Sequence, residues 1–173
     1  MSIIKDAKNG NTEAFVALID EYKTQMYKTA KAILKNEDDV CDAIQEALIS
    51  CYKNIEKLKK EKYFKTWLIR ITINKCYDII EKNNSINNKI EKIIPIEEEI
   101  SNNIEDKIDL NKALRQLDND LRIVTVLYYY DDIQVKDIAD ILEIPAGTVK
   151  SKLSRAREKL YEILKQEEVS KVG

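Results

Sequence analysis

Apolar residues recur three or four positions apart along most of the chain, which is the spacing of a buried helical stripe. This spacing predicts a first helix from about Glu13 to Leu34, a second from about Asp38 to Asn54 and a third from about Tyr63 to Lys82. Only three glycines and two prolines interrupt the pattern in 173 residues, so we expect an all-α fold. The buried stripe predicted for the first helix is Phe15, Leu18, Ile19, Tyr22, Met26, Ala30 and Ile33.

The second helix has two faces of opposite character. Its apolar face is predicted to be buried, and the other face combines acids, an amide and one isoleucine. Such an exposed face suits a protein partner, although a solvated acidic surface has the same pattern. The apolar face is Val40, Ile44, Ala47 and Cys51, and the opposite face is Asp42, Gln45, Glu46 and Ile49.

The third helix carries polar groups suited to an unpaired nucleic-acid base. Arg70 and Asn74 are one turn apart on one face, between Thr66 and Tyr77. An arginine and an asparagine stacked in this way can hold a flipped base and its strand. The opposite stripe is predicted to be buried, and we place Trp67 beside it in the core, although an indole could also stack on bases. That stripe is Phe64, Leu68 and Ile71.

Residues 135–160 form two short amphipathic helices joined by residues 143–148. Pro145 lacks an amide hydrogen, so it ends the first helix and suits the start of the second. This pattern is typical of a helix-turn-helix, which inserts its second helix into DNA. The first apolar stripe is Val135, Ile138, Ala139 and Leu142, and the second is Val149, Leu153, Ala156 and Leu160.

The second of these helices concentrates positive charge in a chain whose net charge is −2. Residues 146–161 contain five cations and one acid. Small polar groups and an arginine can contact base edges while long cations reach phosphates; the alternative is an ordinary solvated helix face. The candidate DNA-contacting residues are Thr148, Lys150, Ser151, Lys152, Ser154, Arg155 and Arg157.

Helical periodicity is lost after Lys82, where Asn, Ile, Glu and Ser dominate around Pro95 and the acidic run Glu97–Glu99. We therefore predict two small helical domains, residues 1–82 and 108–173, joined by a flexible linker over residues 83–107. The second is expected to be a four-helix unit with a frayed tail beyond Gln166. A tether of this length spans at most roughly 80 Å, enough to engage two DNA sites.

The sequence lacks the residues that several classes of function require. The chain has no histidine, no glycine-rich phosphate loop and no nucleophile motif, so we expect no enzymatic activity, no metal, no cofactor and no small-molecule substrate. The three cysteines, Cys41, Cys51 and Cys76, are far apart and are interpreted as small apolar residues. No signal peptide and no apolar run of about 20 residues is present, which favours a cytoplasmic protein.

Two groups of motifs resemble the extracytoplasmic-function (group IV) sigma factors of RNA polymerase. In the carboxy-terminal part these are Ile138-Ala139, the run Ile144–Leu153 and Arg155-Ala156-Arg157. In the amino-terminal part they follow the spacing of the family's promoter-melting domain. The matches span residues 14–164 in family order, and they are specific jointly although each is weak alone. The amino-terminal residues are Asp42, Gln45, Glu46, Phe64, Thr66, Trp67, Leu68, Ile71, Asn74 and Asp78.

The resemblance implies an alternative sigma factor that binds core RNA polymerase and directs promoter-specific initiation, often in a stress response. Residues 1–82 would be sigma region 2 and residues 108–173 sigma region 4, which reads the minus-thirty-five element. Asp42, Gln45, Glu46 and Ile49 would bind the polymerase clamp helices. A cognate anti-sigma factor, often membrane-anchored, is a further implied partner. The implied minus-ten contacts are Lys60, Tyr63, Thr66, Arg70 and Asn74.

The sequence departs from the family at two places. The end of the third helix, residues 80–83, lacks the usual arginines, which puts phosphate contacts there in doubt. Gln134 stands where a better helix cap is common.

Two other functions fit the same motifs: a one-component helix-turn-helix regulator, and a helical adaptor whose basic helix docks on an acidic protein. Binding to core polymerase distinguishes a sigma factor from both.

Overall fold

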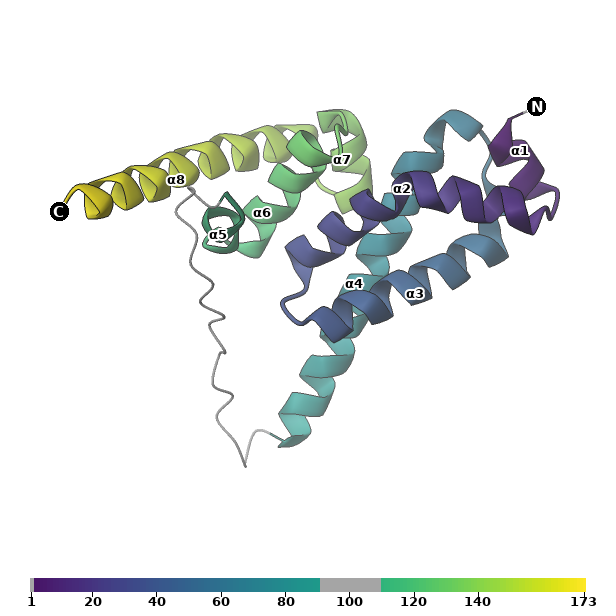
Figure 1. Cartoon of the computed structure of the whole chain (residues 1–173), viewed down its shortest axis with the longest axis horizontal. Helices are drawn as coiled ribbons and strands as arrows, with labels where there is room; N and C mark the ends of the chain where they lie inside the picture. Colours follow the sequence, from purple (N-terminus) through teal and green to yellow (C-terminus); the bar gives the residue numbers. More distant parts are fainter. Residues whose placement is uncertain (1, 91–109) are drawn as a thin grey trace.

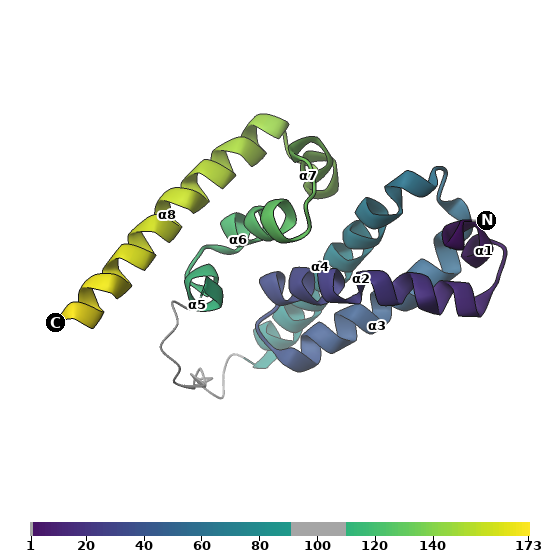
Figure 2. The same cartoon turned by 45° about the horizontal axis from the view of Figure 1, so that its top comes forward.

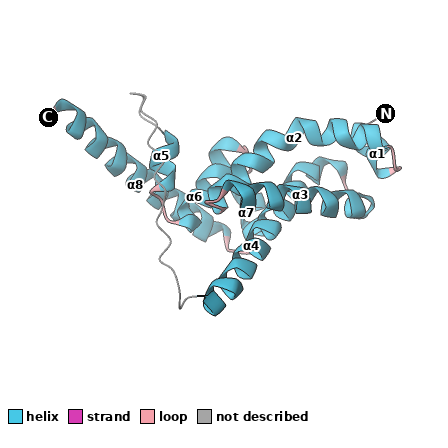
Figure 3. Cartoon of the chain, turned by 60° about the horizontal axis from the view of Figure 1, so that its bottom comes forward, coloured by secondary structure: helices cyan, strands magenta, loops and turns pink. Residues whose placement is uncertain are grey.

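The computed structural model describes residues 2–90 and 110–173, and every regular element within these ranges is a helix (Figure 3). The N-terminal unit, residues 2–90, comprises α1 (Ile3–Lys8), α2 (Thr12–Ile33), α3 (Glu37–Asn54), η1 (Ile55–Lys57), η2 (Glu61–Tyr63) and α4 (Phe64–Ile90). The C-terminal unit, residues 110–173, comprises α5 (Leu110–Arg115), α6 (Asn119–Thr125), the π-helical turn η3 (Val126–Tyr130), α7 (Val135–Leu142) and α8 (Ala146–Val172). Most of the predicted linker, with Pro95 and Glu97–Glu99, lies outside the described residues.

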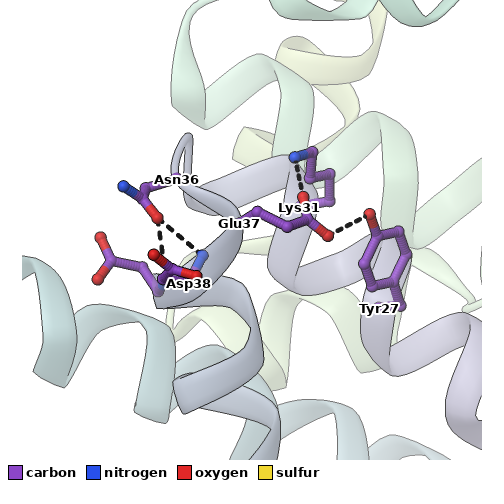
Figure 4. Close-up of polar contacts among 6 residues, drawn as sticks. Tyr27, Lys31, Asn36, Glu37 and Asp38 are labelled. Carbon is purple, nitrogen blue, oxygen red and sulfur yellow. Dashed lines mark hydrogen bonds and ion pairs between the residues drawn. The ribbon is translucent and has the colours of Figure 1, made fainter.

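The junction between α2 and α3 shows why the chain reverses there (Figure 4). The side chain of Asn36 caps α3 by accepting a 2.7 Å hydrogen bond from the amide of Asp38. Glu37, in the first turn, accepts a 2.7 Å hydrogen bond from the Tyr27 hydroxyl and one from the Lys31 ammonium, both on α2. Lys31 and Tyr27 hold the pKa of the Glu37 carboxyl below its ordinary value. The acidic first turn of α3 is thus hydrogen-bonded to α2.

The core of the N-terminal unit confirms the predicted helical stripes. Trp67 is half-buried against this core, with its ring centroid 6.1 Å from that of Phe64, so its predicted core position is confirmed. Helix α1 was not predicted, because its six residues are too few to establish a periodicity. The buried residues of this core are Ala7, Phe15, Leu18, Met26, Ala47, Cys51, Ile55, Leu58, Phe64 and Leu68.

Two predicted helix ends were wrong. Helix α4 continues past Lys82 to Ile90, and α8 continues past Gln166 to Val172. Neither extension has an apolar stripe for a sequence pattern to detect. Both lack internal glycine and proline, and adding a residue to an existing helix costs far less than nucleating one.

The two units pack on each other through one core, which we call the shared cluster. Helices α6 and α7 lie beside α2 and α4, while the far end of α8 points away from the N-terminal unit (Figures 1 and 2). We call this packing the closed arrangement. The sequence predicted two helical domains but gave no sign that they would share a core. The shared cluster is Ala30, Ile33, Leu34, Val40, Ala43, Ile69, Ile73 and Cys76 with Ile123, Val124, Leu127, Ile133, Ile138, Ala139, Ile141, Val149 and Leu153.

A buried arginine reinforces the closed arrangement. Arg122 on α6 is 8% exposed and donates from Nε to the carbonyl of Ala32 at the end of α2. Its Nη1 donates to the carbonyls of Arg115 and Leu117 at 3.2 and 3.3 Å, and its Nη2 donates to the side-chain oxygen of Asn119. Burial lowers the pKa of this guanidinium. The side chain therefore connects three segments through their backbone oxygens.

The predicted helix-turn-helix is confirmed as α7 and α8. Glu143 ends α7 in the left-handed conformation with φ of 55°, and Pro145 occupies the N-cap position of α8. Gln134 at the start of α7 makes no side-chain capping bond, as expected from its type. The turn places α8 across the end of α7 with its N-terminal half beside α6 and α7.

Candidate nucleic-acid and polymerase interfaces

The first half of α8 has one buried face and one open face. Val149, Leu153 and Ala156 are at most 3% exposed. Ser154 and Arg155 lie on the opposite side and are exposed. This division follows from helical spacing, because residues separated by about two positions point to opposite sides. The open face therefore has the polar groups that base recognition uses.

Acids and a tyrosine of the C-terminal unit hold some of the cations of α8. Lys152, whose side chain is 19% exposed, pairs with Asp120 of α6 at 2.9 Å. Arg157 donates a 3.0 Å hydrogen bond to the Tyr129 hydroxyl. The sequence analysis missed these contacts, because the partners lie 32 and 28 residues away and no local pattern relates them. The outer cation Lys159 likewise pairs with Asp118, at 2.6 Å.

The remaining predicted DNA-contacting residues of α8 are more accessible. Lys150, Ser151, Ser154 and Arg155 are exposed, and Thr148 is half-buried beside the turn. Within residues 2–90 and 110–173, Lys150 and Arg155 make no ion pair. The open cationic surface is consequently narrower than the charge count of the sequence indicated. Its arginine, Arg155, follows Ser154 directly and lies one helical turn after Ser151.

The polar face of α4 lies against the helix-turn-helix. Arg70 pairs with Glu143 through its Nη2 at 3.0 Å, which joins α4 to the turn between α7 and α8. Asn74 and Tyr77 line a cavity of about 260 Å³ together with Lys152 and residues of α7. Burial and Asp120 raise the pKa of Tyr77. Arg70 and Asn74 both remain exposed, although Glu143 pairs with Arg70 and α7 borders the cavity beside Asn74.

The segment before α4 remains open. Lys60 precedes η2 and is exposed, and Tyr63 at its end is 45% exposed. The ammonium of Lys62 lies 4.9 Å from the centroid of the Tyr63 ring. Thr66 is half-buried in the first turn of α4. The five predicted minus-ten residues thus lie partly on the segment before α4 and partly on the face of α4 beside the turn between α7 and α8.

The outer face of α3 is open, as its pattern predicted. Asp42, Gln45 and Glu46 are exposed, and Ile49 is 51% exposed. Tyr52, one turn further, is 47% exposed and packs edge-on against Phe15 with ring centroids 5.0 Å apart. The sequence analysis did not include this tyrosine in the face. An apolar centre bordered by acids is suited to contact with another protein.

Two of the three cysteines, Cys51 and Cys76, are buried. Burial raises the pKa of Cys51 and Cys76 to about 12, so both stay protonated at neutral pH. Cys41 is exposed, so its expected place among the buried apolar residues was wrong.

In the described part of the chain, no three histidine, cysteine or carboxylate side chains are grouped as metal ligands would be. No helix there is long and apolar enough to cross a membrane.

Comparison with known proteins relates the chain that carries these surfaces to a family. Residues 18–86 match the family model of sigma-70 region 2, and residues 107–160 match that of sigma-70 region 4. The ECF RNA polymerase sigma factor SigW of Bacillus subtilis is 32% identical, over 94% of this chain and 95% of that protein. The RNA polymerase sigma factor SigV of the same organism is 28% identical, over 94% and 99%.

A solved structure has the same fold. The sigma factor RpoE of Bartonella quintana, in complex with the anti-sigma factor NepR, superposes with a TM-score of 0.70 at 24% identity, over 86% of this chain and 97% of that one. The open face of α8 lies in the region 4 match, and the exposed face of α3 and the polar face of α4 lie in the region 2 match. The chain belongs to the extracytoplasmic-function sigma factors of RNA polymerase.

Proposed function

We propose that this chain joins core RNA polymerase in the cytoplasm and directs it to promoters through two DNA-contacting surfaces. It acts as an alternative transcription initiation factor and not as an enzyme. The observation that carries the proposal is the coincidence of each exposed polar surface with its sigma region, in family order along one chain.

The upstream promoter element is contacted by the open face of α8. Arg155 is the candidate for a bidentate contact with a base edge, flanked by Ser151 and Ser154. Lys150 and Arg157 are placed to reach phosphates on either side. Lys152 contributes only if it exchanges Asp120 for a phosphate, and Thr148 supports the start of the helix. Asp120 is largely exposed in this ion pair, so the pair is weak enough for such an exchange.

The minus-ten element is contacted by the segment before α4 and by the polar face of that helix. Lys60 and Tyr63 border the place for an unpaired base, and Thr66 continues it into α4. Asn74 is exposed, and Arg70 completes the contact once it exchanges Glu143 for the DNA strand. The competing ion pair supports weak promoter binding by the free protein and stronger binding within the polymerase holoenzyme.

Core RNA polymerase is bound by the outer face of α3. Asp42, Gln45 and Glu46 supply polar contacts around Ile49, which is an exposed apolar residue with no role in the core. The position of this face within the region 2 match supports the assignment. A chain that binds polymerase in this way needs only a modest DNA affinity of its own, in keeping with its net charge of −2.

A protein inhibitor is a further proposed partner. A structural relative was solved in complex with its anti-sigma factor NepR, and another, CnrH, in complex with the cytosolic domain of CnrY. We extend this mode of control to the present chain. Its inhibitor would be a cognate anti-sigma factor.

Run-off transcription with purified core polymerase on fragments of genomic DNA tests the proposed function. Start sites should share two sequence elements, and Arg155→Ala should weaken use of the upstream element by roughly 1–3 kcal/mol in a promoter titration. Binding to core polymerase should be unchanged, because Arg155 lies far from α3. Arg115→Ala, which removes an exposed arginine outside α8, serves as the control.

Two results would contradict this. Unchanged transcription of Arg155→Ala from every dependent promoter removes this residue from the DNA site. Absence of promoter-specific initiation with wild-type protein and active core polymerase contradicts the proposed function as a whole.

A further inference from the structure

Asp131 is a buried carboxyl at the contact between the two units. It follows η3 directly and is 0% exposed. Its Oδ2 accepts a 2.7 Å hydrogen bond from the hydroxyl of Thr29, which is 1% exposed on α2. Its Oδ1 is buried without any hydrogen-bond partner in the described residues. A charged carboxylate in this position loses its hydration and regains only part of it.

The charged groups around this carboxyl compensate little for its burial. Lys65 of α4 donates its ammonium hydrogen bond to the backbone carbonyl of Asp131, not to the carboxylate. Lys28 of α2 lies over the Tyr130 ring, 4.8 Å from its centroid. Burial raises the pKa of Asp131 to about 6, although the Thr29 hydrogen bond and these two lysines act in the opposite direction. The neighbouring acid Asp132 is exposed to water.

A second buried oxygen at this contact also lacks a hydrogen-bond donor. Gln25 Oε1 is buried without a donor, and Gln25 lies one helical turn before Thr29 on the same helix. A protonated carboxyl supplies an O–H group, which an ionised one lacks. Among the described side chains, Gln25 and Asp131 are the two that leave a buried oxygen unpaired. Both belong to elements packed at the contact between the units.

We propose that Asp131 is a proton-operated clasp between the two units. Its neutral carboxyl holds η3 against Thr29 on α2, and its ionisation releases the C-terminal unit from the closed arrangement. Separation exposes the carboxylate to water and lets it recover its hydration. The closed arrangement is therefore the form that binds the proton more tightly.

The direction of the pH effect follows from this difference. The carboxyl has its ordinary pKa of 3.8 in the separated form and about 6 in the closed form. The contribution to closure is fully present below the ordinary pKa and is lost as the pH rises through about 6. By linkage, these two pKa values predict that the ratio of closed to open protein falls about tenfold between pH 5 and pH 8.

The composition of the chain makes this effect observable. It contains no histidine, so no side chain of ordinary pKa changes charge through the middle of that interval. The consequence for promoters rests on the proposed function: acidification would keep Glu143 paired with Arg70 and so keep this arginine from the minus-ten element. The clasp itself does not depend on that function, and its test uses neither DNA nor polymerase.

Small-angle X-ray scattering of the full chain tests the clasp. The radius of gyration of the wild-type protein should increase between pH 5 and pH 8. Asp131→Asn, which keeps an acceptor for Thr29 but cannot ionise, should stay compact throughout. Asp132→Asn makes the same change in the exposed neighbouring acid and should behave as the wild type. Thr29→Val, which removes the hydroxyl donor, should be expanded at both pH values.

A carboxyl titration of the wild-type protein gives a second measurement that needs no variant. The ¹³C signal of the Asp131 carboxyl should titrate well above the ordinary value and together with the change in radius. The proposal is overturned if the radius of the wild-type protein stays constant, or if Asp131→Asn expands with the same midpoint. A carboxyl that titrates at its ordinary value overturns it as well.

Discussion

Arg122→Met is expected to lower the free energy of unfolding by about 2–4 kcal/mol. Methionine fills much of the volume of the arginine side chain but donates no hydrogen bond. The substitution leaves the carbonyls of Ala32 and Leu117 without the donors that the guanidinium supplies at this buried position. Both units should lose stability, because Arg122 joins α6 to the end of α2. Urea unfolding followed by circular dichroism measures the effect.

Arg115→Met is the matched control, since Arg115 is exposed on the neighbouring helix α5. A surface change of this kind should stay within about 0.5 kcal/mol. Equal stabilities of the Arg122 and Arg115 variants would show that the buried guanidinium does not hold the segments together.

Phe64→Ala is expected to cost about 3–5 kcal/mol of unfolding free energy, because it opens a cavity in a packed core. Phe64 is 1% exposed and starts α4, with its ring centroid 5.4 Å from Tyr22 and 6.1 Å from Trp67. The helix that carries Arg70 and Asn74 is therefore fixed at its first turn by this ring. A loss of stability should appear as a lower urea midpoint with a similar slope.

Tyr63→Ala, one residue earlier, provides the comparison for this prediction. Tyr63 is 45% exposed, so its removal should change stability by less than about 1 kcal/mol. A Phe64 variant no less stable than the Tyr63 variant would contradict the placement of Phe64 in the core.

The sequence predicted the helices wherever burial is periodic. The stripe from Phe15 to Ile33 and the two faces of α3 could be derived because one side of each helix packs on a core. The extensions of α4 to Ile90 and of α8 to Val172 could not be derived, because apolar residues are sparse in both segments. The shared cluster was also beyond the sequence, since residues such as Ile73 and Ile141 show only that they are apolar and not which unit they contact.

The candidate sites could likewise be predicted only in part. Exposure of Ser154 and Arg155 follows from their position opposite the apolar stripe of α8. The ion-pair partners of Arg70 and Lys152 could not be predicted from position. Glu143 lies 73 residues from Arg70, and Asp120 lies 32 residues from Lys152. Periodicity assigns a residue to a helix face, and only the tertiary structure determines what lies against that face.

The closed arrangement gives the proposed function a specific physical requirement. The open face of α8 is accessible as the protein stands, whereas Arg70 on the polar face of α4 is paired with Glu143 of the turn. Use of Arg70 at the minus-ten element therefore requires this ion pair to break. Contact with polymerase through α3 is compatible with either form, because that face lies outside the shared cluster.

Titration of core RNA polymerase with the full chain tests the central claim most directly. The wild-type protein should bind stoichiometrically, and the double variant Gln45→Ala/Glu46→Ala should bind at least about tenfold more weakly, a loss of about 1.4 kcal/mol. Gln166→Ala/Glu167→Ala makes the same chemical change near the end of α8 and should bind as the wild type. Failure of the wild-type protein to bind core polymerase would contradict its proposed function as a sigma factor. Equal binding by both double variants would contradict the assignment of the α3 face.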